Sequence, residues 1–247
     1  MTEKKSTVSE HLLELRSRLL KSIIFLIITF IVCYIFSDKI YNFLVDPYAQ
    51  AVKDDGNNRR LIFTALHETF LTYLKLAFFA AFFFSCPLIL MQIWKFVAPG
   101  LYKDEKLALV PFLIATPVLF LLGGMLVYYL IMPLAIKFFL SFETAAINGS
   151  LPIQLEAKVN EYLSLVMRLI LAFGISFQLP VFLTLLAKVG FITSEYLKTR
   201  RKYVVIIIFS MAAILTPPDP ITQIGLALPL LLLYEISIFT VKFVEKK

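Results

Sequence analysis

The sequence predicts an all-α integral membrane protein with six transmembrane helices, the last two of them short. The 247 residues are 60% hydrophobic and 17% charged, and their mean hydropathy is +0.84. A soluble domain needs a charged surface, and this chain has too few polar residues to make one. Its apolar residues fall in runs near the ~20 residues that a helix needs to cross a bilayer. Its Lys and Arg residues cluster between these runs, which argues against nucleic-acid binding.

Six apolar runs are the expected spans, and they place residues 1–247 in one polytopic membrane domain. The runs are 19–36, 71–97, 107–139, 162–186, 203–215 and 224–241. No small-residue cleavage site follows the first run, so we expect it to be retained as a span. The third run is long enough to cross with residues to spare. The fifth and sixth are short for a full span, which implies a locally thinned bilayer or incomplete crossing.

Prolines mark the irregular points of these runs. Pro87 interrupts the second run, and the turn Thr216-Pro217-Pro218-Asp219-Pro220 separates the last two. In the fourth run, Pro180 removes a backbone donor and clashes with the carbonyl of Ser176, so a kink is expected there. Gln178 is a polar side chain at membrane depth, where it needs a partner or water. Both an interhelical hydrogen bond and a functional role are open for it.

Basic residues near the ends of the runs predict the orientation. If the amino terminus is inside, sixteen Lys and Arg residues lie on the cytoplasmic side and six on the other. Because basic residues concentrate in cytoplasmic loops, both termini are expected inside. The two larger outer loops, 37–69 and 141–161, are then expected to cap the outer face. Cys33 and Cys86 lie within apolar runs and are interpreted as small hydrophobic residues.

Two acidic residues near the cytoplasmic face are the candidate binding groups. In the amphipathic segment 11–20, His11, Glu14 and Arg18 share one helical face. One interpretation is an interfacial anchor in which Glu14 pairs with Arg18, while Glu105, in the first cytoplasmic loop, is a solvated acid. The other is that Glu14 and Glu105 converge on a cationic partner. Such a site prefers arginine to lysine, because a guanidinium fork fits a carboxylate.

Four motifs, in order, carry a resemblance to a known family. They are His11…Glu14-Leu15-Arg16…Arg18, Phe96-Val97-Ala98-Pro99-Gly100-Leu101-Tyr102…Glu105, Phe173-Gly174…Phe177-Gln178-Leu179-Pro180 and Leu215-Thr216-Pro217-Pro218-Asp219…Gln223. The chain resembles the TatC family, the signal-peptide receptors of the twin-arginine protein translocase. The resemblance extends from about His11 to Glu235. It implies a cup-shaped bundle with both ends cytoplasmic. We expect this bundle in a bacterial inner membrane, and an organellar membrane is the alternative.

The resemblance also implies functional residues. Glu14 and Glu105 would bind the two arginines of a signal peptide. The residues that shape, flank or orient this site would be Arg16, Arg18, Phe96, Leu101, Tyr102 and Lys103. Thr216 and Gln223 would offer a polar site to single-span partners of the TatA and TatB type, within an oligomeric complex surrounded by lipid. Pro47 and Pro180 would be structural.

One position departs from the family pattern. Many family members have Glu where this chain has Gln178. Because glutamine cannot ionise, a proton-coupled role at this position is not expected. A polar contact with lipid or with a partner remains open.

Two other functions make demands on the sequence that it does not meet. A small-solute or ion secondary transporter needs ionisable residues at the midplane, where this sequence offers chiefly Gln178. An intramembrane enzyme needs a nucleophile beside a base, and the chain has only His11 and His67 as histidines and no HExxH or GxSxG motif. We therefore expect a receptor, with no enzymatic activity, cofactor, metal or nucleic-acid partner.

Overall fold

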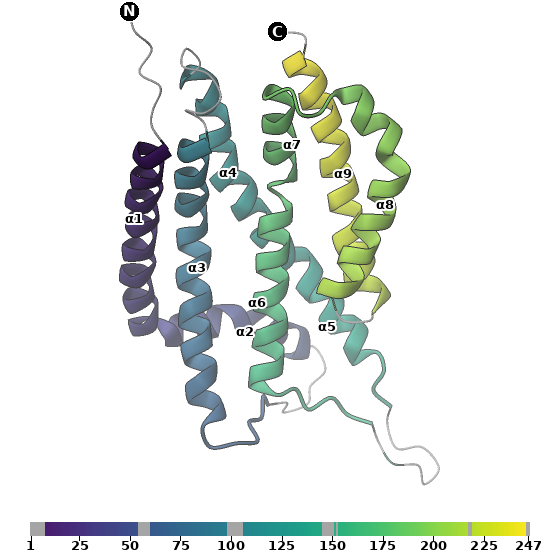
Figure 1. Cartoon of the computed structure of the whole chain (residues 1–247). Helices are drawn as coiled ribbons and strands as arrows, with labels where there is room; N and C mark the ends of the chain where they lie inside the picture. The colour runs from purple at the N-terminus through teal and green to yellow at the C-terminus, as the bar shows by residue number, and fades with distance from the viewer. Residues whose placement is uncertain are drawn as a thin grey trace, which may run out of the picture.

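The computed structural model describes residues 8–53, 60–97, 106–144, 151, 153–216 and 219–245. In these residues every regular element is a helix, and two isolated β-bridges join loop segments, Ile62 with Lys158 and Thr144 with Ile153. Figure 1 shows long helices side by side, with one helix, α2 (Ser37–Lys53), lying crosswise behind their lower parts. The predicted all-α class is confirmed.

The helices have the following bounds. In chain order they are α1 (Val8–Ile35), α2 (Ser37–Lys53), α3 (Glu68–Val97), α4 (Lys106–Leu126), the π-helix η2 (Val127–Ile131), α5 (Met132–Leu140), α6 (Val159–Ser176), α7 (Leu179–Lys188), α8 (Ser194–Leu215) and α9 (Pro220–Glu245). α4, η2 and α5 follow one another as one long segment, as do α6 and α7 across a break.

Five segments of the described chain are long and apolar enough to cross a membrane. They are Leu12–Ile35, Glu68–Ile93, Pro111–Leu140, Val159–Lys188 and Pro220–Glu245. They match the first, second, third, fourth and sixth predicted runs. The fifth run is the second half of α8, whose first half holds four Lys and Arg residues, Lys198, Arg200, Arg201 and Lys202. The count of six spans therefore stays a prediction.

Two predictions about length and loops were wrong. The last helix is not short, because α9 has 26 residues and begins at Pro220, directly after the turn. Its first turn is fixed by Asp219, whose carboxylate accepts the Thr222 backbone N–H at 2.7 Å and the Thr222 hydroxyl. The first outer loop is not all loop, because residues 37–53 form α2.

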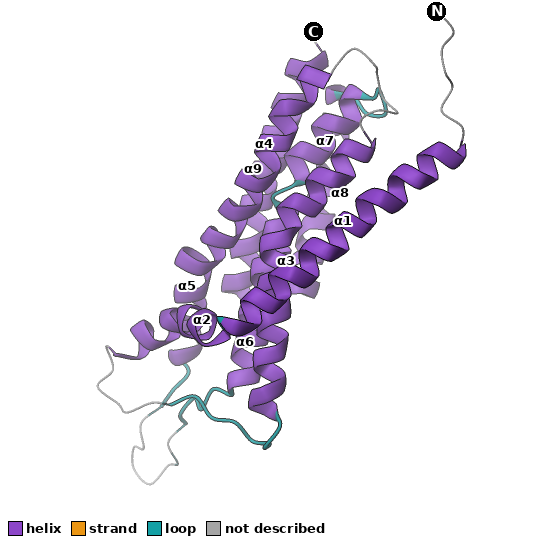
Figure 2. Cartoon of the chain, turned by 90° about the vertical axis from the view of Figure 1, so that its left-hand side faces the viewer, coloured by secondary structure: helices purple, strands orange, loops and turns teal. Residues whose placement is uncertain are grey.

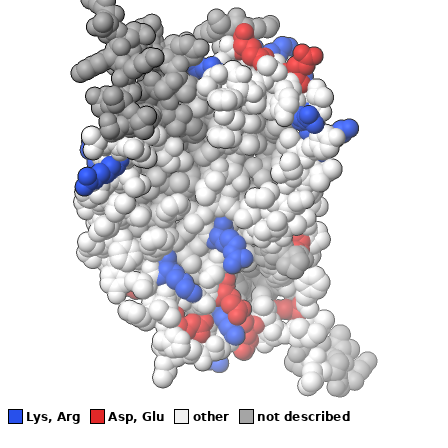
Figure 3. All heavy atoms as spheres, viewed as in Figure 1, with Lys and Arg blue, Asp and Glu red and all other residues white. Residues whose placement is uncertain are grey.

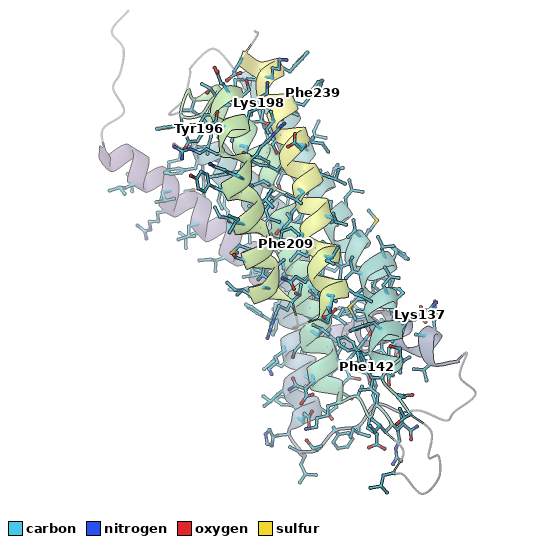
Figure 4. All side chains as sticks on the ribbon, turned by 90° about the vertical axis from the view of Figure 1, so that its right-hand side faces the viewer. Lys137, Phe142, Tyr196, Lys198, Phe209 and Phe239 are labelled. Carbon is cyan, nitrogen blue, oxygen red and sulfur yellow. The ribbon has the colours of Figure 1, made fainter. Side chains whose placement is uncertain are left out.

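The two ends of the bundle differ. Figures 1 and 2 show α1 beginning and α9 ending at one end, which we call the terminal end, while α2 lies crosswise at the opposite, or α2, end. Basic residues assigned to the cytoplasmic side, such as Lys198, lie at the terminal end, and Lys137 lies towards the α2 end (Figure 4). In Figure 3 an uncharged band crosses much of the middle of one face, with charged side chains above and below it. This distribution suits a helical bundle that crosses a bilayer.

Pro47 determines how α2 attaches to the bundle. It is buried inside α2, where it has no N–H to give to the carbonyl of Phe43 four residues earlier. The Tyr128 hydroxyl donates to that carbonyl at 2.9 Å, and the Tyr128 and Phe43 rings stack with centroids 4.3 Å apart. The Tyr162 hydroxyl donates to the next carbonyl, of Leu44, at 3.0 Å. Two tyrosines from the spanning helices therefore hold α2 in place.

Glycine lets the central helices approach closely. A Cβ on Gly123 of α4 would lie 2.7 Å from the backbone oxygen of Phe173 in α6. Small residues at such crossings allow membrane helices to pack backbone to backbone. Gly190 acts differently: its φ of +83° ends α7, with Gly190 N–H bonded to the carbonyl of Ala187 and Phe191 N–H to that of Leu186. This is a Schellman cap.

Candidate functional site

Glu14, the first candidate acid, lies on α1 near the terminal end and is held by Arg18. The Arg18 guanidinium donates to Oε1 of Glu14 through Nη2 at 2.6 Å and through Nε at 3.0 Å. The side chains of Glu14 and Arg18 are 36% and 24% exposed, so the pair is partly shielded but reachable. The i, i+4 pair expected from the sequence is confirmed.

Arg18 also joins α1 to α3. Its Nη1 donates to Oε1 of Gln92 at 3.2 Å, across 74 positions of the chain. α1 packs along α3, with Phe30 of α1 against Phe78 of α3 (ring centroids 6.5 Å apart). One guanidinium therefore connects the acid on α1 with the part of α3 that leads into the first loop.

Gln92 is the residue that the sequence analysis missed. No motif marks it, because it stands in an apolar helix, two residues before Trp94. A polar residue in the last turns of a span, facing the same end as an Arg on the neighbouring helix, was the available signal. The sequence alone does not say which two helices are neighbours.

The second acid and most of its flanking residues lie outside the described residues. These are Glu105, Leu101, Tyr102 and Lys103. Phe96 is described and is partly buried in the last turn of α3, and Arg16 is exposed on α1. Lys106, which follows Glu105 in the chain, begins α4 at the terminal end (Figure 1). The convergence of Glu14 and Glu105 stays a prediction.

Gln178 occupies the break between α6 and α7. α6 ends at Ser176 and α7 begins at Leu179, with Pro180 in its first turn, so the expected irregularity at Pro180 is confirmed. Gln178 is 8% exposed and its Nε2 donates to the backbone oxygen of Thr116 in α4 at 3.1 Å. Its Oε1 is buried without a hydrogen-bond partner among the described residues. The interhelical hydrogen bond is thus present, and a functional role is untested.

Thr216 and Gln223 flank the turn between α8 and α9. Thr216 caps α8, is buried, and donates its hydroxyl to the carbonyl of Ala212 at 2.9 Å. Gln223, partly buried in the first turns of α9, is on the other side of the turn. Thr216 ends α8, and Gln223 lies in the first turns of α9, whose start Asp219 caps; the partner role of both residues stays a prediction.

An ion pair and several hydrogen bonds join α8 and α9 near the terminal end. The Arg201 guanidinium meets the Glu235 carboxylate at 2.6 Å, and the Tyr234 hydroxyl donates to the carbonyl of Leu197 at 2.7 Å. Ser194 donates its N–H and hydroxyl to the two oxygens of Glu245 at 2.7 and 2.5 Å. Glu235 therefore forms an interhelical ion pair with Arg201. Since both partners are half exposed, the pair adds little to stability.

The described part of the chain offers no cluster of metal ligands. It contains no group of three or more His, Cys, Asp or Glu side chains placed to hold an ion. The groups at the terminal end are instead carboxylates, guanidinium groups and an amide. Such a set suits recognition by charge-assisted hydrogen bonds.

Comparison with known proteins identifies the family. The family model of the Sec-independent protein translocase protein (TatC) matches residues 10–229. A TatC of Magnetococcus marinus is 49% identical over 99% of this chain and 87% of its own length. That of Rickettsia prowazekii is 46% identical over 96% of this chain and 92% of its own.

A solved structure agrees with the sequence relatives. A crystal structure of the twin arginine translocase receptor TatC superposes with a TM-score of 0.79 at 38% identity, covering 96% of this chain and 100% of that one. The relatives are named as components of a protein translocase, which is a transport role and not catalysis. The chain is a multi-pass membrane protein that belongs to the TatC family of Sec-independent protein translocase proteins.

Proposed function

We propose that this protein is the receptor subunit of a twin-arginine translocase and binds the paired arginines of signal peptides through Glu14 and Glu105. The observation that carries the proposal is the partly exposed Glu14 held by Arg18 and, through it, Gln92. The terminal end, where this group lies, is the cytoplasmic face, with both termini inside a bacterial inner membrane.

Recognition rests on the shape of the guanidinium group. The Arg18 guanidinium donates two hydrogen bonds to Oε1 of Glu14, so the carboxylate is oriented before a peptide binds. The guanidinium group of a peptide arginine can donate two parallel hydrogen bonds to a carboxylate, whereas the compact ammonium group of lysine cannot. Arg18 also balances the negative charge of the two acids. The site therefore discriminates arginine from lysine by geometry and not by charge.

The remaining steps follow from this docking. The apolar stretch of the bound signal peptide enters the bilayer beside the bundle. Single-span partners of the TatA and TatB type bind at the turn between α8 and α9, near Thr216 and Gln223, and the complex is oligomeric. The folded cargo then crosses with energy from the membrane gradient.

Crosslinking tests the proposal. A signal peptide with a photoreactive group next to an Arg-Arg pair, and the same peptide with Lys-Lys, are added to the purified protein in detergent. Crosslinks are expected for Arg-Arg only, and Glu105→Ala should abolish them. Glu195→Ala, which removes an exposed acid in the first turn of α8, is the matched control and should keep them. Equal crosslinking of the two peptides would contradict the proposal.

A further inference from the structure

An apolar cavity of about 460 Å³ lies at the α2 end, away from the candidate site. Its wall comes from α2, α3, α4, η2 and α6, and it is partly open. The volume falls within the ~300–1,000 Å³ range of ligand pockets. Its lining is almost entirely aliphatic and aromatic, and includes Phe79, Phe83 and Leu121.

One charged residue lines this cavity. Lys39 lies in the first turn of α2, four residues after α1 ends at Ile35, and its side chain is exposed. Its Nζ is 5.3 Å from the centre of the Phe36 ring. Since the apolar span of α1 ends at Ile35, the ammonium group sits at the level where the bilayer meets water. The phosphates of phospholipids lie at the same level.

The length of the cavity suits part of an acyl chain. Along α4 and η2 its lining runs from Leu121 to Tyr129. At 1.5 Å per helical residue, these eight steps cover about 12 Å, somewhat over a third of a ~30 Å hydrocarbon core.

An extended peptide fits this cavity poorly. It would leave its backbone groups without partners against the apolar wall. An acyl chain has no polar groups to satisfy, and its head group carries the negative charge that Lys39 complements.

We propose that this cavity is a phospholipid site, in which one acyl chain lies between α3 and α4 and the phosphate pairs with Lys39. The bound lipid fills the space between α2 and the spanning helices and so supports the crosswise position of α2. The inference does not depend on the receptor role proposed above.

Photoreactive lipids test this site. The full-length protein is placed in phosphatidylcholine vesicles that contain phosphatidylglycerol with a diazirine in one acyl chain. A second sample contains the matched diacylglycerol, which lacks the phosphate. After irradiation, mass spectrometry compares labelling of the peptide that holds Phe79 and Phe83 with that of the peptide that holds Phe239. Phe239 is 71% exposed on α9 and reports general lipid contact.

The expected result is specific labelling of the cavity. Phosphatidylglycerol should label the α3 peptide at least fivefold more than diacylglycerol does, with no such difference at Phe239. Lys39→Gln should remove the difference, whereas Lys137→Gln, which changes an exposed lysine of α5 towards the same end, should keep it. Leu121→Trp should lower the labelling by filling the cavity. Equal labelling by the two lipids, or no effect of Lys39→Gln, would overturn the proposal. Loss of labelling on adding a twin-arginine signal peptide would also overturn it, in favour of the peptide as occupant.

Discussion

Replacing Tyr128 with Phe tests how α2 is held to the bundle. The change keeps the ring that stacks on Phe43 and removes only the hydroxyl that donates to the Phe43 carbonyl at 2.9 Å. Because Pro47 cannot supply the usual helical N–H, this carbonyl would lose its donor. A buried acceptor left unpaired costs about 1–3 kcal/mol. Since this hydrogen bond is only partly buried, we expect the free energy of unfolding to fall by about 1–2 kcal/mol.

The assay is chemical unfolding in mixed detergent micelles, with one control variant and one double-mutant cycle. Tyr129→Phe removes a hydroxyl from the exposed neighbour and should change the free energy of unfolding by less than about 0.5 kcal/mol. In a Pro47→Ala background, residue 47 regains an N–H for the Phe43 carbonyl. The cost of Tyr128→Phe should then fall by about 1 kcal/mol, as a double-mutant cycle would measure. An unchanged cost in that background would refute the reasoning.

Three further predictions concern packing, the site and the buried amide. Gly123→Ala should lower the free energy of unfolding by about 1–3 kcal/mol, measured in the same micelles, because α4 and α6 must separate. Gln92→Ala should weaken binding of a twin-arginine peptide about two- to tenfold by titration calorimetry, because the group that orients Glu14 loses one hydrogen bond of about 0.5–1.5 kcal/mol. Gln178→Leu should change the free energy of unfolding by less than about 1 kcal/mol, because the bond to Thr116 and the unpaired Oε1 are removed together.

Each of these predictions has a control. Gly124→Ala should cost less than Gly123→Ala, since its Cβ would meet side chains and not backbone: the ring of Phe83 at 3.0 Å and Ile170 at 3.6 Å. Lys21→Ala removes an exposed charge from α1 and should leave peptide binding unchanged; an equal loss would point to a general charge effect. A loss above about 3 kcal/mol for Gln178→Leu would show that Gln178 belongs to a larger polar network.

The sequence predicted what depends on local spacing. The apolar runs predicted the five apolar spans. The i, i+4 spacing predicted the Glu14–Arg18 pair, and Pro180 predicted the break after α6. These features need no knowledge of which helices are neighbours. Each is fixed by residues within one continuous segment of the chain.

Features that depend on tertiary contact were not predicted. The sequence does not reveal α2, because its polar residues and Pro47 hide a buried stripe of residues spaced four apart, Leu44, Tyr48 and Val52. The contact between Arg18 and Gln92 joins two helices whose adjacency no motif reveals.

The most direct test of the account is a cycle of affinities between peptide and protein. Dissociation constants are measured for Arg-Arg and Lys-Lys signal peptides with the wild-type protein and with Glu105→Gln. The account predicts that the wild type prefers Arg-Arg at least tenfold, about 1.4 kcal/mol, and that the preference largely disappears in Glu105→Gln. Equal affinity of the wild type for both peptides, or a preference that survives in Glu105→Gln, would contradict it.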